Sequence, residues 1–169
     1  MPSRFHRLAA ALTAAVLAAP ALAAGPASSD PAAPVAALYA AEKAGRPALA
    51  EPSRRAAALT RSLAALWTKA EAAARRNGDA VVDFDVVTNS QGAEIKSYAL
   101  KVERRDAARA SVVATIDPGD WIRASPQENR IRYALLRQAG RWRIDEVAGV
   151  AGTTPWSLRD MLEHALRAP

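Results

Sequence analysis

The chain has 169 residues, no cysteine, two histidines and a formal net charge of +6 at pH 7. Without cysteine it can form no disulfide, no thiol nucleophile and no thiolate metal site. Only His164 lies beyond the first 23 residues. That part of the chain therefore holds no zinc site made of several histidines, and it has one imidazole for a Ser-His-Asp triad.

The first 23 residues have the three-part pattern of a secretory signal peptide. Arg4 and Arg7 precede an apolar run over residues 8–19, Pro20 interrupts the run, and the small residues 21–23 follow. The run is shorter than the roughly 20 apolar residues that span a bilayer. We therefore predict export, with a retained membrane-anchoring helix as the alternative.

Cleavage near Ala23 or Ala24 removes two arginines and no acid, which leaves a formal charge of +4. We expect a periplasmic or secreted protein with no stable membrane anchor after cleavage. A charge of this size does not indicate nucleic acid binding. The expected partner is an envelope or extracellular molecule, such as an acidic protein or polymer, and no cofactor is expected.

Residues 24–34 combine alanine, proline and serine without apolar periodicity, which predicts a flexible leader. A single domain over residues 35–167 should follow, and it should begin with a short helix over residues 35–44. Ser53 has the character of an N-cap for a second, long helix that ends at Asn77.

Beyond residue 78 the apolar period changes from helical to alternating. Five strands are predicted, over Ala80–Val87, Glu94–Arg104, Ala108–Asp117, Asn129–Gln138 and Arg141–Val147. Short turn sequences separate several of these segments, which favours hairpins and an antiparallel sheet.

Thr154 and Pro155 suit the N-cap and the first position of a closing helix. The whole pattern predicts an α+β fold. N-terminal helices, one of them long, should precede an antiparallel curved sheet of about four to five strands and a C-terminal helix. One sheet face should pack on the helices, and the other should be more polar or curve around a cavity.

Three stretches resemble a family of small exported bacterial proteins defined only as a domain of unknown function: residues 63–91, residues 140–145 and residues 157–159. That family's fold is similar to the nuclear-transport-factor-like and cystatin-like superfamilies. The family lies near the immunity proteins of type VI secretion amidases. The resemblance implies a fold and a compartment but no mechanism. Gly92 stands where the family pattern often has an aspartate, so a polar site formed there in relatives would be incomplete here.

We predict no catalytic, cofactor-binding or metal-binding residue. The candidate binding residues are Asp83, Asp85, Gln91, Tyr98, Trp121, Tyr133, Trp142 and Asp145. On a strand, Asp83 and Asp85 would point to the same face. Such a pair can act as acid and base or hold a cation with Asn89 or Gln91. The alternative is that both carboxylates face water or pair with arginines.

The aromatic candidates each have two interpretations. Trp142 can line a ligand pocket, but its alternation with Ile144 is typical of a core position. Trp121 follows a Pro-Gly turn, where an aromatic side chain either binds a partner or fills the core. Tyr98 and Tyr133 would be available to an enzyme that uses an aspartate in a sheet cavity.

Charged residues on the last two predicted strands suggest a basic strip. Arg130, Arg132, Arg141 and Arg143 share outward parity, so they could face an acidic partner, an anionic lipid or a cell-wall polymer, unless the register separates them. Asp145 is expected to pair with Arg132 or Arg143 across the strands. A solvated face is the alternative.

Three functions remain open at this point. The first is a non-enzymatic periplasmic or secreted binding module. The second is an immunity or inhibitor-type protein that binds an envelope hydrolase or toxin. The third is a small enzyme that uses Asp83 and Asp85 in the sheet cavity.

Overall fold

A computed structural model describes residues 29–92, 95–120 and 123–167. The predicted signal peptide, most of the predicted leader and Trp121 lie outside the described residues. In chain order, the elements are α1 (Ala32–Lys43), α2 (Pro52–Ala58), α3 (Arg61–Asn77), β1 (Ser97–Arg105), β2 (Arg109–Asp117), the 3-10 helix η1 (Pro126–Asn129), β3 (Arg130–Gln138), β4 (Arg141–Ala151), β5 (Thr154–Ser157) and α4 (Leu158–Arg167).

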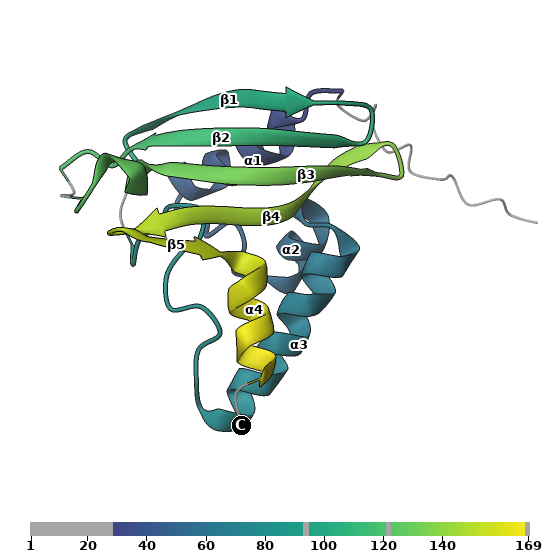
Figure 1. Ribbon diagram of the computed structural model, residues 1–169, viewed down its shortest axis with the longest axis vertical. Helices are drawn as coiled ribbons and strands as arrows, with labels where there is room; N and C mark the ends of the chain where they lie inside the picture. Colours follow the sequence, from purple (N-terminus) through teal and green to yellow (C-terminus); the bar gives the residue numbers. More distant parts are fainter. Residues whose placement is uncertain (1–28, 93–94, 121–122, 168–169) are drawn as a thin grey trace, which may run out of the picture.

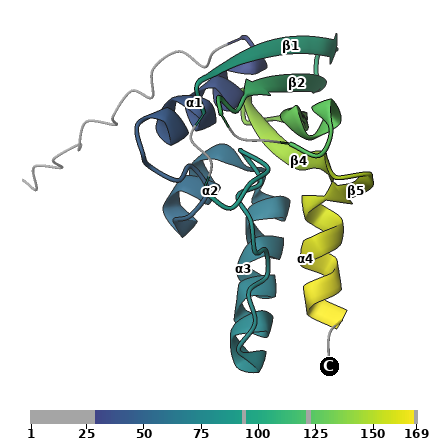
Figure 2. The same ribbon diagram turned by 90° about the vertical axis from the view of Figure 1, so that its left-hand side faces the viewer.

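The five strands form one sheet in the order β1-β2-β3-β4-β5, and every neighbouring pair is antiparallel. The helices lie on one side of this sheet (Figure 1). Figure 2 shows α3 and α4 as two neighbouring helices that extend away from the sheet. The predicted α+β class with an antiparallel curved sheet and a C-terminal helix is confirmed.

The core lies between the sheet and the helices because alternate strand residues face the helical side. Register places Val112, Tyr133 and Val147 in one row across β2, β3 and β4, and all three are fully buried. From the helices, Val35 and Leu63 pack into the same cluster. Burying a side chain of this size contributes about 2 kcal/mol, so these rows fix which sheet face receives the helices.

The helix predicted from Ser53 to Asn77 is two helices: its end at Asn77 is confirmed, but its start is wrong. The chain between α2 and α3 is extended at Leu59 and Thr60. Leu59 forms a parallel bridge with Ile144, and the Thr60 N–H donates to the Ile144 carbonyl at 2.8 Å. The Thr60 hydroxyl then accepts from the Leu63 N–H at 3.3 Å and caps α3. Pairing with the β4 edge overrides the local helix propensity.

The predicted strand Ala80–Val87 is also wrong. Residues 79–92 form an irregular segment whose bridge joins Asp85 to Ser90 across a turn. The segment leaves α3 at Gly78, which adopts φ +77°, and returns alongside the helices to the sheet (Figure 1). The valines of this segment come as the adjacent pairs 81–82 and 86–87. They join no ladder of the described sheet, whose edge is β1.

The closing helix begins later than predicted. Thr154 and Pro155 belong to β5, which pairs with Ala148–Ala151 of β4, and α4 starts at Leu158. The Thr154-Pro155 pair therefore marks a short edge strand, where a missing N–H is tolerated, rather than a helix start. None of the helices in the described ranges is long and apolar enough to cross a membrane.

Candidate functional site

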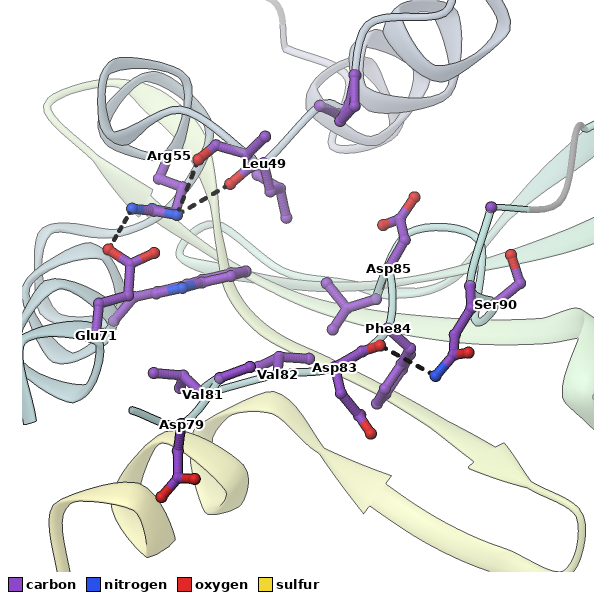
Figure 3. Close-up of a pocket in the computed structure, with 18 of the residues that line it drawn as sticks. Leu49, Arg55, Glu71, Asp79, Val81, Val82, Asp83, Phe84, Asp85 and Ser90 are labelled. Atoms are coloured by element: carbon purple, nitrogen blue, oxygen red, sulfur yellow. Dashed lines mark hydrogen bonds and ion pairs between the residues drawn. The ribbon is translucent and has the colours of Figure 1, made fainter. Parts of the chain in front are cut away.

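A cavity of about 980 Å³ lies on the helical side of the molecule (Figure 3). It is bounded by the loop between α1 and α2, by helices α2 and α3, and by residues 78–92. Its larger apolar lining residues include Leu49, Trp67, Val81, Val82, Phe84 and Val86. The cavity therefore depends on the irregular segment, which the sequence had suggested would be a strand.

Arg55 joins two walls of this cavity. The side chain is buried, and its guanidinium donates to the Leu49 and Ala50 carbonyls, each at 3.2 Å. Its other terminal nitrogen pairs with Glu71 of α3 at 2.7 Å, and the guanidinium lies over the Trp67 ring at 4.8 Å. These contacts fix the loop against α3. The sequence reasoning missed this pair, since an arginine in an alanine-rich helix resembles a solvated residue.

Asp85 shapes the opposite wall. Its carboxylate accepts hydrogen bonds from the Val87 N–H at 2.8 Å and from the Thr88 hydroxyl at 3.1 Å. Burial raises the pKa of Asp85, and these hydrogen bonds oppose that rise. The carboxylate thus holds the turn over residues 86–89 while lining the cavity.

The interpretation in which Asp83 and Asp85 share one face of a strand is wrong. Figure 3 shows the two carboxylates pointing apart, because the segment bends at Asp83 instead of continuing as a strand. Asp83 is exposed, and its carbonyl accepts from the Gln91 side chain at 3.3 Å. All three residues line the cavity, so the structure brings them to one site without making an acid–base pair.

A second hollow of about 1040 Å³ lies between the end of α3, the 79–83 segment and α4. Asp79 and Asp83 line both hollows, and Asp160 and His164 of α4 line this one. The helical side therefore carries several carboxylates. Within the described residues, no group of three or more histidine or acidic side chains is placed to hold a metal ion.

Tyr98 and Tyr133 belong to an aromatic cluster around Tyr39. The Tyr133 hydroxyl donates to the Tyr39 hydroxyl at 3.0 Å, and Tyr39 donates to the Val87 carbonyl at 2.9 Å. Tyr98 stacks on Tyr39 with ring centroids 4.7 Å apart. Burial raises the pKa of both Tyr39 and Tyr133. Tyr133 is fully buried, so its expected role in a binding pocket is not what the structure shows.

Glu42 lies at the loop side of this cluster. Its carboxylate accepts a hydrogen bond from the Ala48 N–H. Burial raises the pKa of Glu42 to about 7, and the nearby Asp85 charge adds to this rise. The cavity loop is therefore joined to a carboxyl group that titrates near neutral pH.

Asn89 connects the irregular segment to the far end of the sheet. It adopts φ +53°, its amide donates to the Glu128 and Val150 carbonyls, and its side-chain oxygen accepts from Trp156 at 3.0 Å. Arg123 donates to the Asn89 carbonyl at 2.5 Å. The Asn-Ser-Gln-Gly sequence predicted a turn here, but only the tertiary structure shows this network.

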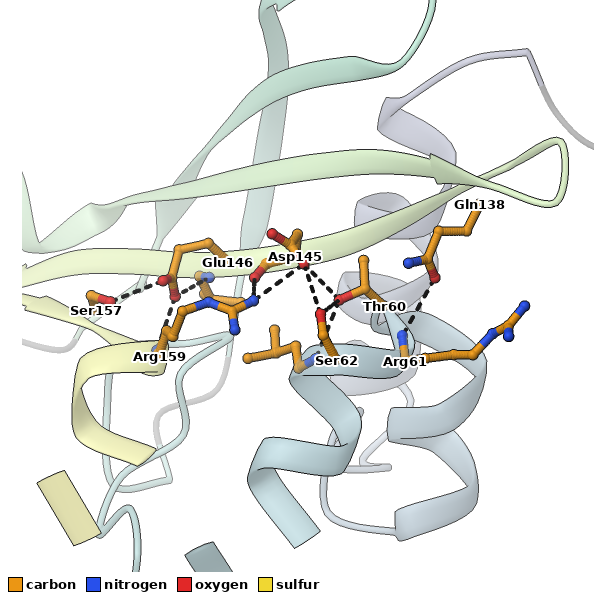
Figure 4. A network of polar contacts seen from close by, with 10 residues as sticks. Thr60, Arg61, Ser62, Gln138, Asp145, Glu146, Ser157 and Arg159 are labelled. Atoms are coloured by element: carbon orange, nitrogen blue, oxygen red, sulfur yellow. Dashed lines mark hydrogen bonds and ion pairs between the residues drawn. The ribbon is translucent and has the colours of Figure 1, made fainter. Parts of the chain in front are cut away.

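Asp145 does not pair with Arg132 or Arg143, and that prediction is wrong. The pairing of β3 with β4 shifts register between Ala134 and Leu135. Asp145 is the extra residue of β4 in the β-bulge that results. Its carboxylate accepts from Thr60 at 2.7 Å and from Arg159 of α4 at 3.2 Å (Figure 4). The bulge thus turns the side chain from the sheet face to the start of α3.

Glu146 serves the start of α4 in a similar way. Its carboxylate accepts from the Arg159 N–H at 3.1 Å and from the Ser157 hydroxyl at 2.9 Å. A carboxylate at a helix N-terminus satisfies free N–H groups and favours the helix dipole. Adjacent acids at one bulge therefore fix α3 and α4 to β4.

Trp142 occupies the core, as its alternation with Ile144 suggested. It is 5% exposed, and its indole N–H donates to the Ser29 carbonyl at 3.0 Å. Arg137 lies over the ring at 5.6 Å. The indole therefore fastens the chain before α1 to the sheet instead of lining a described cavity.

The predicted basic strip is divided into two pairs. Arg132 lies opposite Ala148, whereas Arg143 lies opposite Leu136 and Arg141 opposite Gln138. Arg143 pairs with Leu136, which lies four residues along β3 from Arg132. This separation corresponds to about 13 Å along the strand. The four arginines share one sheet face, but they form no continuous strip.

Comparisons with protein-family models, with curated proteins and with solved structures found no match to this chain. The resemblance to a family of exported bacterial proteins therefore stays a prediction.

Proposed function

We propose that this protein is an exported, non-enzymatic binding module that takes a small amphiphilic ligand into the cavity between α2, α3 and residues 78–92. The single observation that carries the proposal is the cavity itself, at about 980 Å³. Pockets for small molecules are concave, mostly apolar and furnished with a few polar groups. The N-terminal signal pattern supports export.

The walls of the cavity support binding without large rearrangement. Arg55 holds the 47–50 loop to α3 through two carbonyls and Glu71, and Asp85 holds the turn that follows the opposite wall. A site that is formed before binding loses less conformational entropy when a ligand enters.

The lining indicates the chemistry of the ligand. Leu49, Trp67 and Val82 offer apolar contacts, whereas the Asp85 carboxylate offers a hydrogen-bond acceptor with negative charge. The guanidinium of Arg55 is already engaged by Glu71 at 2.7 Å. An apolar body that bears a hydrogen-bond donor or a cation therefore fits this site best.

Nile red, a neutral apolar dye, provides a probe that surface charge does not attract. Ala50 is exposed and lines the cavity, so Ala50→Trp should fill its mouth without disturbing the core. We expect dye fluorescence to fall by about tenfold in this variant. Ala57→Trp, at an exposed α2 position outside the cavity lining, is the matched control and should bind as the original protein does.

The native ligand is sought by mass spectrometry of small molecules extracted from protein purified in its own host. A compound present with the original protein and the Ala57→Trp control, and lost with Ala50→Trp, would support the proposal. Equal dye binding by all three proteins, with no co-purifying compound, would refute it.

A further inference from the structure

The sheet face turned away from the helices carries a broad group of cationic side chains. Antiparallel register places Lys101 and Arg132 in one row across the sheet, together with Val113 and Ala148. It places Arg109 and Arg143 in another row, on either side of Leu136. The group comprises Lys101 and Arg104 of β1, Arg109 of β2, Arg130 and Arg132 of β3, and Arg141 and Arg143 of β4. We call it the cationic face.

Most of these charges have no acidic partner. Arg132 pairs with Glu103 at 2.5 Å. Among the described residues, no other member of the cationic face has a carboxylate within salt-bridge distance. Arg109 lies near the Asp106 carboxylate, whose pKa is lowered by hydrogen bonds from the Ala108 and Arg109 N–H groups and also by the Arg109 charge. Five of the seven cations are therefore available to a partner, apart from any contact with residues outside the described ranges.

The helical side of the molecule has mixed charge. Asp79, Asp83 and Asp160 line its hollows, but Arg75 and Arg167 line them too. A protein whose excess of cations lies on one face takes a preferred orientation in the field of a charged surface.

The arrangement of the cations indicates a planar partner. The cations spread over four strands in two dimensions. A linear polymer as the partner would need only a single row of cations. Ala134 lies on the same face between these cations. Because its side chain is small, the longer charged side chains project beyond it. Arg130 and Arg132 also border a shallow hollow of about 240 Å³ whose other residues include Val113 and Gln127.

We infer that the cationic face docks the protein on an anionic phospholipid surface, with lipid phosphates at arginines that have no ion pair within the described ranges, such as Arg130 and Arg143. Six of the seven cations are arginines, whose planar guanidinium pairs with phosphate through two hydrogen bonds. In this orientation the ligand cavity faces away from the membrane, because it lies on the helical side (Figure 1). The inference concerns a separate surface and does not require the cavity to bind a ligand.

The test uses the processed protein, since an attached signal segment would itself enter lipid. Co-sedimentation is measured with phosphatidylcholine vesicles that contain or lack phosphatidylglycerol. We expect binding that needs phosphatidylglycerol and weakens with salt. The double variant Arg130→Gln/Arg143→Gln should bind about 25-fold more weakly, since each basic residue near the surface contributes roughly fivefold.

The matched control removes the same charge from the helical side. Lys69→Gln/Arg76→Gln alters two exposed cations of α3 and should keep vesicle binding within about twofold, because these residues lie off the cationic face. Ala50→Trp should also keep it, which separates this inference from the cavity proposal.

Three results would overturn the inference. One is equal sedimentation with and without phosphatidylglycerol. Another is an equal loss in the two double variants, which would attribute binding to net charge alone. The third is binding to poly-glutamate with no binding to vesicles, which would indicate an acidic polypeptide as the partner.

Discussion

The hydroxyl of Thr60 donates to the carboxylate of Asp145 at 2.7 Å, although the two residues are 85 positions apart. Thr60 caps α3, and Asp145 is the bulged residue of β4. The contact joins the longest helix to the sheet at the point where Leu59 pairs with Ile144. The break between α2 and α3 and the bulge in β4 are therefore parts of one junction.

Asp145→Ala should destabilise the protein by about 2 kcal/mol, because it removes the acceptor for Thr60 and leaves Arg159 without its ion pair. Urea unfolding followed by circular dichroism measures this change. Asp120→Ala, at an exposed loop position, is the control and should stay within about 0.5 kcal/mol. Equal stability of the two variants would show that the junction contributes little.

Arg55→Ala should cost about 3 kcal/mol or more, since it leaves half-buried Glu71 without a partner and releases two carbonyls. Arg54→Ala removes the same side chain from the preceding position, where the guanidinium donates to the Pro47 carbonyl at 3.0 Å and lies near the Glu42 carboxylate at the surface, and should be nearly neutral. The double variant Arg55→Met/Glu71→Leu should recover much of the loss, because no charge remains unpaired. Chemical unfolding of all three variants tests this order.

Stability should depend on pH through Glu42, whose folded pKa of about 7 exceeds its ordinary value of 4.5 because of burial. The folded protein binds this proton more tightly than the unfolded chain does. The stabilisation is therefore complete below pH 4.5 and is lost as pH rises through 7. We expect a loss of about 2 kcal/mol, less than full linkage would give, because water screens a half-buried carboxyl.

Glu42→Gln keeps an acceptor for the Ala48 N–H and should flatten the unfolding free energy between pH 4.5 and 7. Asp85, whose pKa burial also raises, should leave a smaller slope in the variant. Thermal unfolding across this pH range measures both. An unchanged slope in Glu42→Gln would assign the pH dependence to another group.

Asn89→Ala should destabilise the protein by about 3 kcal/mol, since it removes three side-chain hydrogen bonds and places alanine at φ +53°. Asn89→Gly loses the same hydrogen bonds, but glycine adopts this positive φ without strain. It should therefore destabilise the protein less than Asn89→Ala does. Urea midpoints give the comparison. If the two variants are equal, backbone strain contributes nothing at this turn.

Export can be tested by expressing the full chain in a bacterium with a periplasm and sequencing the N-terminus of the mature product. We expect the chain to begin at Ala24 or Gly25, because small residues end the signal pattern there. Replacing Leu12 with Arg interrupts the apolar run and should keep the protein in the cytoplasm. Full-length protein recovered in the membrane fraction would support the anchoring helix instead.

The sequence by itself determined the features that depend on local periodicity. Alternation along residues 129–138 puts Ile131, Tyr133 and Leu135 on one face of a strand, and in the structure that face is buried. The α+β class followed because a period of two and a period of 3.6 are each imposed by backbone geometry within one segment.

Only the tertiary structure decided where the local sequence pattern does not predict the element or the direction of a side chain. The β-branched and aromatic composition of residues 80–87 favours a strand, but their segment packs beside the helices, and Asp83 and Asp85 diverge. Asp145 has the parity of a sheet-face residue, but one bulge turns it to α3. Partners far apart in sequence set these conformations, since a backbone group takes the hydrogen bond that the packed chain offers it, whatever its neighbours in sequence favour.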